Sequence, residues 1–95
     1  MSLRFEWDPG KARANLKKHN VSFEEALTVF ADPPARIFDD EEHSFEEPRE
    51  IIIGHSTRRR LIVVYFTARG ARIRLFGARR TTRLERRDYE ENLNL

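Results

Sequence analysis

The stretch EIIIGHSTRRRLIVVYFTARGARIRLF, residues 50–76, decides the fold that this 95-residue sequence predicts. It contains three runs rich in β-branched and aromatic residues, and short segments with turn-forming residues separate them. The runs are residues 50–55, 61–66 and 72–76. Because connections this short join antiparallel neighbours, we expect three consecutive strands of an antiparallel meander.

The pattern within two of these runs indicates how each strand is buried. Ile51-Ile52-Ile53 places apolar side chains on both faces, as expected of a central strand. In residues 72–76 apolar and basic residues alternate, so Ile73 and Leu75 face one side and the arginines face the other. One face of the sheet is therefore expected to carry arginine.

Two helices are predicted before the meander, and the first begins at Asp8-Pro9. Asp8 can cap this helix, and proline suits its first turn. Asn20 tolerates the left-handed conformation that often ends a helix. The inward stripe is expected to be Ala12, Leu16 and His19, spaced at i, i+4 and i+7.

The second helix has the clearer start signal. Ser22-Phe23-Glu24-Glu25 fits a capping box, in which the Ser22 hydroxyl accepts from the Glu25 N–H and the Glu25 carboxylate reaches back. Asp32-Pro33-Pro34 ends the helix. The residues expected on its apolar face are Phe23, Ala26, Leu27 and Phe30.

The remaining segments complete the order β-α-α-β-β-β-β-α. Residues 3–7 fit a first strand, 35–39 an edge strand, and 39–47 an exposed acidic loop. Thr82-x-x-Glu85 caps a last helix, which we expect to be exposed and mobile because Leu84 and Tyr89 are not at core spacing. The predicted fold class is α+β, an antiparallel sheet of about four to five strands packed against two N-terminal helices.

Length and composition restrict the class of protein. A chain of this size predicts a single domain, residues 1–95, and the absence of cysteine excludes disulfides and thiolate metal sites. The N-terminus is charged where a signal peptide needs an apolar run, and the longest apolar run, 61–66, is far too short for a membrane span. We expect a cytoplasmic protein without membrane association.

Charge is distributed unevenly along the chain. Residues 1–48 hold six Lys or Arg against eleven Asp or Glu, a net −5. Residues 49–95 hold twelve arginines and no lysine against five Asp or Glu, a net +7. Guanidinium groups bind phosphate bidentately and stack on bases, so the second half predicts contact with nucleic acid. A solvated basic surface is the alternative explanation.

The residue types favour RNA cleavage without a cofactor. The sequence lacks a P-loop, a G-x-G-x-x-G motif and H-E-x-x-H, and its three histidines have no ligand spacing, so we expect no metal site. Internal attack of a 2′-hydroxyl on the neighbouring phosphate needs a base, an acid, and positive charge on the transition state. Arginine and histidine can supply all three.

Several arginines are expected near one sheet surface, where they could hold a scissile phosphate. Arg72 and Arg74 share a strand face, Arg79 follows them, and the turn 58–60 lies beside that strand. Ordinary solvation of an outer strand face is the alternative. His55 ends a central strand next to the turn and is the better placed histidine, whereas His19 is expected on a buried stripe and His43 in the acidic loop.

Several segments together resemble the BrnT toxin family, over nearly the whole chain. The matching motifs are Phe5-Glu6-Trp7-Asp8, Lys11-Ala12, Asn15, Lys18-His19, Val21 to Ala26, Arg72 to Leu75, Ala78 to Thr81, Glu85-Arg86-Arg87 and Tyr89. Two positions depart from the pattern. Asn20 stands where many relatives have glycine, and Gly77 replaces a serine whose hydroxyl could bond phosphate.

The resemblance implies a RelE-like fold and an endoribonuclease that inhibits translation. It also implies a BrnA-type antitoxin with a ribbon-helix-helix DNA-binding part, so that the two chains form a hetero-oligomer that reaches operator DNA only through the antitoxin. Arg79 and Arg72 would stabilise the transition state, and His55 or His19 would move protons. The expected RNA-binding residues are Arg58, Arg59, Arg60, Arg74, Arg80, Arg83 and Tyr89.

Two other functions remain open from the sequence. The charge asymmetry equally suits a non-catalytic nucleic-acid-binding or regulatory subunit. It also suits a protein–protein module whose arginines pair with an acidic partner. Tyr89 has two interpretations as well, because it could stack on a base or cover the edge of the core.

Overall fold

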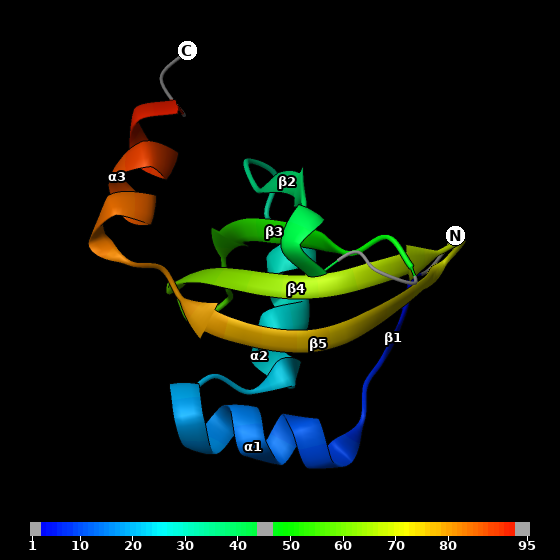
Figure 1. The fold of residues 1–95 in the computed structure, drawn as a ribbon. Coiled ribbons are helices and arrows are strands. Elements are labelled where there is room, and N and C mark those ends of the chain that lie inside the picture. The colour runs from blue at the N-terminus through cyan, green and yellow to red at the C-terminus, as the bar shows by residue number, and fades with distance from the viewer. Residues whose placement is uncertain (1–2, 44–46, 93–95) are drawn as a thin grey trace.

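The computed structural model describes residues 3–43 and 47–92, and it is an α+β fold as predicted (Figure 1). The strands are β1 (Arg4–Glu6), β2 (Arg36–Asp39), β3 (Glu50–His55), β4 (Leu61–Arg69) and β5 (Arg72–Arg80). The helices are α1 (Pro9–His19), α2 (Phe23–Leu27) and α3 (Arg83–Asn92), with short 3-10 segments η1 (Thr28–Ala31) and η2 (Glu41–His43). None of the helices in these two ranges is long and apolar enough to cross a membrane.

The five strands form one sheet in the order β1-β5-β4-β3-β2. Strands β2 to β5 pair antiparallel in chain order, which confirms the predicted meander and places β2 at an edge. The first strand differs from the expectation of an antiparallel sheet, because β1 lies parallel to β5, with Phe5 opposite Ile73. The sheet is therefore mixed. The helix α1 between β1 and the rest of the chain makes this parallel return possible.

One face of the sheet is covered by α1 and α2, and the main core lies beneath them (Figure 1). From α2 and its flanks, Val21, Phe23 and Val29 are completely buried. They pack against Ile52, Ile62, Val64, Phe66, Ile73, Leu75 and Ala78 of the sheet. These sheet residues alternate along their strands with residues of the opposite face, as the strand period requires.

The two predicted helix starts are confirmed by their caps. The Asp8 carboxylate accepts from the Lys11 N–H at 2.9 Å, and the Ser22 hydroxyl accepts from the Glu25 N–H at 3.0 Å. Asn20 ends α1 in the left-handed region, with φ 57°. The carboxylate of Glu25, which we expected to reach back to residue 22, instead binds Ser56 and Arg60 across the domain.

The inward stripe of α1 differs from the prediction at Leu16, whose surface is 48% exposed. Asn15 faces the sheet instead. Its amide nitrogen donates to the carbonyls of Val21 and Ala78 at 2.9 and 2.8 Å, and its oxygen accepts from the Ala78 N–H at 3.0 Å. These bonds fix the rotation of the helix, so Leu16, one position further around it, turns outward.

Strands β4 and β5 are longer than the apolar runs that predicted them, and both extend by three to four residues into polar sequence. The pairing shifts at Tyr65 and Phe66, which lie opposite Gly77 and Leu75. Phe76 is thereby the extra residue of a β-bulge. The longer β5 carries Arg79 within the sheet rather than beyond its end.

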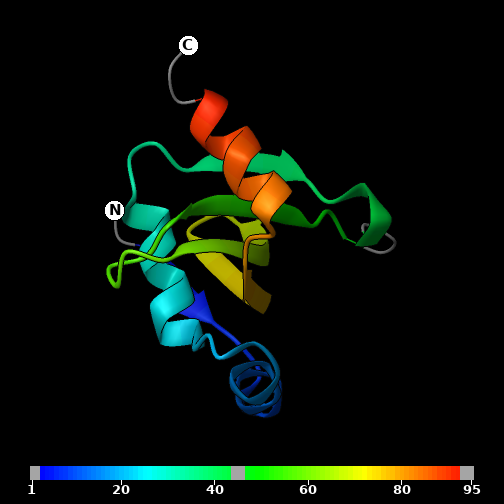
Figure 2. The ribbon, with the colours of Figure 1, turned by 90° about the vertical axis from the view of Figure 1, so that its left-hand side faces the viewer.

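The last helix begins at the predicted capping box, with both halves formed. The Glu85 N–H donates to the Thr82 hydroxyl at 3.2 Å, and the Thr82 N–H donates to the Glu85 carboxylate at 2.8 Å. The helix lies beside β2 and β3, on the side of the sheet away from α1 and α2 (Figure 2), and Arg36 donates to the Asn92 carbonyl at 3.3 Å.

Tyr89 is a correction to the prediction for α3, because it is only 4% exposed. Its hydroxyl lies 3.3 Å from the Pro34 carbonyl and 3.5 Å from the Asp32 carboxylate. A single aromatic residue therefore anchors a helix whose other apolar residue in the described range, Leu84, is 60% exposed.

Candidate nucleic-acid interface

Arg72, Arg74 and Arg79 of β5 lie on the sheet face that is turned away from α1 and α2, which we call the α3 face. Arg80 pairs with Ile62 of the main core and therefore lies on the other face, at the end of the strand. The register places Arg79 opposite Val63, Gly77 opposite Tyr65, and Arg72 opposite Arg69. Val63 and Tyr65 are not among the residues of the main core, which fill the other face. The predicted arginine-bearing face is therefore present.

Arg72 and Arg79 lie at opposite ends of this face. Seven residues separate them along β5, which is about 23 Å at about 3.3 Å per residue. Arg72 and Arg74 line a hollow of 290 Å³ near the β4–β5 turn, together with Glu6, Glu47, Thr67 and Arg69. The structure thus does not bring Arg72 and Arg74 together with Arg79, and one phosphate cannot contact both ends.

Arg79 is held in place by two neighbouring side chains. Its terminal nitrogens donate to the two oxygens of Glu85 at 2.8 and 2.9 Å, and its Nε donates to the Tyr65 hydroxyl at 3.2 Å. Nη1 also lies 3.2 Å from the Arg80 carbonyl. These contacts engage four of the five N–H groups that a guanidinium carries. The hydrogen bonds that Arg79 donates to Glu85 raise the pKa of Arg79 further above its already high value, so the charge is permanent.

Glu85 has its own charge fixed by the same contacts. The hydrogen bond from Arg79, reinforced by the bonds from Thr82, lowers the pKa of Glu85 to about 2, against the opposing effect of burial. The carboxylate is 31% exposed and the Arg79 side chain 28%. The pair is therefore an oriented, half-buried ion pair at the start of α3.

His55 lies on the same face at the same end of the sheet. Its backbone N–H donates to Asp32 Oδ2 at 2.8 Å, and its Nδ1 lies 4.0 Å from the same oxygen. The ring meets Tyr89 edge to face, with centroids 5.8 Å apart, and the side chain is 41% exposed. Burial, followed by the charge of Asp32, raises the pKa of Tyr89. His55 is thus oriented on one side and open to solvent on the other.

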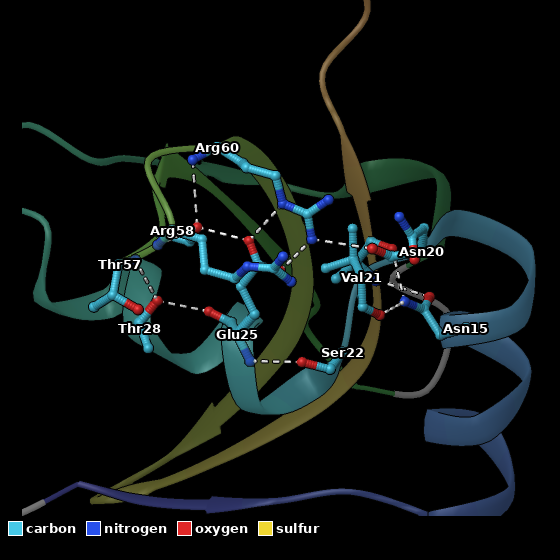
Figure 3. A network of polar contacts seen from close by, with 11 residues as sticks. Asn15, Asn20, Val21, Ser22, Glu25, Thr28, Thr57, Arg58 and Arg60 are labelled. Carbon is cyan, nitrogen blue, oxygen red and sulfur yellow. Dashed lines mark hydrogen bonds and ion pairs between the residues drawn. The ribbon is translucent and has the colours of Figure 1, made fainter.

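The arginines of the β3–β4 turn have two different environments (Figure 3). Arg60 is a structural residue: its Nε donates to Glu25 at 2.9 Å, its Nη2 donates to the Asn20 carbonyl at 3.0 Å, and its side chain is 16% exposed. Arg58 is 69% exposed and lies 3.7 Å from Glu25. Arg59 is exposed as well, at a left-handed φ of 64°.

Glu25 explains why Arg60 is bound so firmly. Its side chain is 3% exposed, and it also accepts from the Ser56 hydroxyl at 2.7 Å. The hydrogen bond from Arg60 lowers the pKa of Glu25 despite its burial. A buried carboxylate needs such partners, and Arg60 is therefore engaged within the domain. Its position does not support the expectation that it contacts RNA.

The other predicted site residues divide between the two faces. His19 ends α1, on the helix-covered side of the sheet, so it lies across the sheet from His55. Arg80 and Arg83 are exposed at the point where β5 gives way to α3. Tyr89 is buried and cannot stack on a base without leaving its place. The exposed cations at the His55 end are thus Arg58, Arg59, Arg80 and Arg83.

Sequence reasoning missed the residues that orient Arg79 and His55. The sequence marks Glu85 as a helix cap and as part of a family motif, but its contact with Arg79 depends on the extension of β5 to Arg80. Asp32 was recognised only as a helix end, although it binds His55 in β3. Within residues 3–43 and 47–92 there is no cluster of three or more His, Cys, Asp or Glu side chains arranged to hold a metal ion.

Comparisons with known proteins support one family. A family model described as the ribonuclease toxin BrnT of type II toxin–antitoxin systems matches residues 7–85. The crystal structure of the Brucella abortus ribonuclease toxin BrnT is similar with a TM-score of 0.65 and 20% sequence identity. The alignment covers 86% of this chain and 100% of that one, which shows a common fold. A search of curated proteins finds no match.

Proposed function

Because the chain belongs to the BrnT family of ribonuclease toxins of type II toxin–antitoxin systems, we propose that it cleaves RNA by internal 2′-hydroxyl attack without a metal ion. The observation that carries this proposal is the oriented Arg79 at the same end and on the same face as the half-exposed His55. A fixed cation and a group that can move a proton are two requirements of this reaction.

Arg79 suits the stabilisation of transition-state charge because it needs no reorientation when the charge develops. Glu85 and Tyr65 hold the guanidinium, and one Nη2–H is left without a described contact. That N–H can donate to a phosphate oxygen, and the permanent positive charge acts at short range. Glu85 is in this mechanism a positioning residue.

His55 is the proposed base that takes the 2′-hydroxyl proton. Asp32 Oδ2 lies 4.0 Å from Nδ1 and accepts from the His55 backbone N–H, so this carboxylate orients the residue. The other ring nitrogen, Nε2, would take the proton from the RNA 2′-hydroxyl. The exposed arginines 58, 59, 80 and 83 would then hold the phosphates on either side of the scissile bond.

The family supplies the biological setting of the proposal. A type II toxin acts together with a protein antitoxin. We expect a BrnA-type antitoxin with a ribbon-helix-helix DNA-binding part, binding of operator DNA through that part alone, and inhibition of translation when the antitoxin is absent. An antitoxin that neutralises this activity would cover the basic end of the α3 face, and we therefore expect bound RNA and bound antitoxin to exclude each other there.

The test is cleavage of a defined single-stranded RNA by purified protein in EDTA. We expect products with a 2′,3′-cyclic phosphate or its hydrolysis product, because internal attack forms that ring. Arg79→Ala should lower the rate by about 100-fold or more, as loss of an oriented transition-state donor does. Arg13→Ala is the matched control, because Arg13 is exposed on α1, on the opposite side of the sheet. Activity that needs added Mg²⁺ would contradict the proposal.

One observation favours the alternative of a non-catalytic nucleic-acid-binding or regulatory subunit. Four of the five N–H groups of Arg79 already have protein partners, so this arginine has little capacity left for RNA. The alternative predicts RNA binding that weakens with salt, together with an intact RNA after long incubation. The cleavage assay therefore separates the two functions.

A further inference from the structure

The middle of the α3 face contains a hollow of 270 Å³ that no predicted site residue lines. Its walls are Asp40, Arg49, Tyr65, Phe76 and Gly77. It lies between the two arginine-rich ends, because Tyr65 and Gly77 pair near the middle of β4 and β5. The hollow is thus on the path that an RNA strand would follow along the face.

The walls of the hollow are aromatic rings with cations next to them. The Arg49 guanidinium lies 4.0 Å from the centroid of the Phe76 ring, and the Lys11 ammonium lies 5.5 Å from it. The Arg79 guanidinium lies 5.9 Å from the centroid of Tyr65. Aromatic rings and guanidinium planes are the groups on which unpaired RNA bases stack.

The local backbone provides the space. Phe76 is the extra residue of the bulge, and Gly77 beside it has no side chain. A Cβ at Gly77 would lie 3.7 Å from both the Tyr65 ring and Asn15 Oδ1, in ordinary van der Waals contact. Any larger side chain at position 77 would therefore occupy part of the space next to Tyr65.

The charges of the hollow favour a flat, uncharged group over a phosphate. Asp40, which is only 6% exposed, brings one negative charge and Arg49 brings one positive charge, so the walls are formally neutral and offer no net attraction to phosphate. A base has polar edges that a carboxylate and a guanidinium can both bond, and an uncharged ring that stacks. Tyr65 also bonds Arg79, so the hollow and the proposed cleavage site share a side chain.

We propose that this hollow binds one unpaired base of a single-stranded RNA, stacked against the Tyr65 ring and the Arg49 guanidinium that lies over Phe76, and so fixes the position of the backbone relative to Arg79. The inference rests on the proposed ribonuclease function, because it assigns the substrate of that site. It adds a base-binding subsite, and therefore a source of sequence preference, that lies away from the reacting atoms.

The experiment measures binding apart from cleavage. The probe is a 2′-O-methyl RNA octamer, which lacks the attacking hydroxyl, with 2-aminopurine placed at each position in turn. We expect one position to lose fluorescence on binding, because 2-aminopurine is quenched when it stacks. Phe76→Ala removes the ring that holds the Arg49 guanidinium in place and should weaken binding by about fivefold to 150-fold, the range for loss of one stacking partner of a base. Phe38→Ala is the control, since Phe38 is 47% exposed on the edge strand β2.

A second variant keeps the rings and closes the space. Gly77→Val should weaken binding of the octamer at least tenfold, without loss of secondary structure in circular dichroism, because the added methyl groups lie beside Tyr65. If the wild type binds the octamer and both variants bind it equally well, the hollow is not a base site, although the ribonuclease proposal stands. Absence of both binding and cleavage in the wild type would overturn the two together. Weaker binding of the antitoxin, with RNA binding unchanged, would assign the hollow to the protein partner instead.

Discussion

Glu85 binds both terminal nitrogens of Arg79, at 2.8 and 2.9 Å, while one of its oxygens also accepts from the Thr82 N–H. One carboxylate thereby caps a helix and orients the arginine that we place at the reaction centre. The start of α3 and the end of β5 are thus fixed to each other at the site. A substitution in either element should therefore alter the position of the other.

The energetic coupling of this pair can be measured with a double-mutant cycle on Arg79→Ala and Glu85→Ala. We expect each single variant to lose about 1–2 kcal/mol of unfolding free energy and the double variant to lose less than the sum, with a coupling of at least about 0.5 kcal/mol. Urea denaturation gives the four values. Additive losses would show that the contact contributes nothing to stability.

The same pair predicts how stability depends on pH. The pKa of Glu85 is lowered from 4.5 to about 2 in the folded protein, so its contribution is fully present above pH 4.5 and is lost as the pH falls toward 2. The difference in unfolding free energy between the wild type and Glu85→Gln should therefore shrink steadily over this range. Chemical denaturation at a series of pH values measures it. A difference that stays constant, or grows on acidification, would be incompatible with the ion pair.

The turn arginines should separate stability from RNA binding. Arg60→Ala leaves the buried Glu25 carboxylate without its main partner and should cost about 3–5 kcal/mol, whereas Arg58→Ala should change stability by no more than about 0.5 kcal/mol. Arg58→Ala should instead weaken RNA binding and reduce its salt dependence by about one counterion. Arg60→Lys, which keeps the charge, should recover part of the loss. Equal destabilisation by the two alanine variants would contradict the assignment of a structural role to Arg60 and of RNA binding to Arg58.

The two candidate histidines should differ in their effect on cleavage. His55→Asn removes the proposed base on the Arg79 side of the sheet and should lower the cleavage rate by about 100-fold or more, with RNA affinity nearly unchanged. His19→Asn, on the helix side, should have a much smaller effect on that rate. Initial rates and affinity for the uncleavable octamer give both quantities. A larger effect of His19→Asn would move the site to the opposite face.

Most of the fold was predictable because its signals are local. The caps at Asp8 and Ser22 and the alternation at residues 72–76 depend on neighbours within a few positions. The parallel placement of β1 was not predictable in this way, because Phe5 and Ile73 are 68 positions apart and no turn links them directly.

The site was less predictable, because its residue types are repeated and their partners are distant. Arg58, Arg59 and Arg60 are identical in the sequence, and only a carboxylate 35 positions from Arg60 makes that residue structural. Tyr89 has no apolar stripe around it, yet it is buried against Asp32 and Pro34, more than 50 positions away. Hydrophobic periodicity indicates on which face of its own helix or strand a residue lies. It does not indicate which other element packs against that face.

The position of β1 beside β5 also bears on the synthesis of the protein. Arg4 leaves the ribosome 68 residues before its strand partner, Arg72. The sheet is therefore incomplete until β5 has emerged, and contacts of such long sequence separation form slowly. Arg79 and Glu85 come later still, so a nascent toxin acquires its basic end only after β5 and the start of α3 have been synthesised.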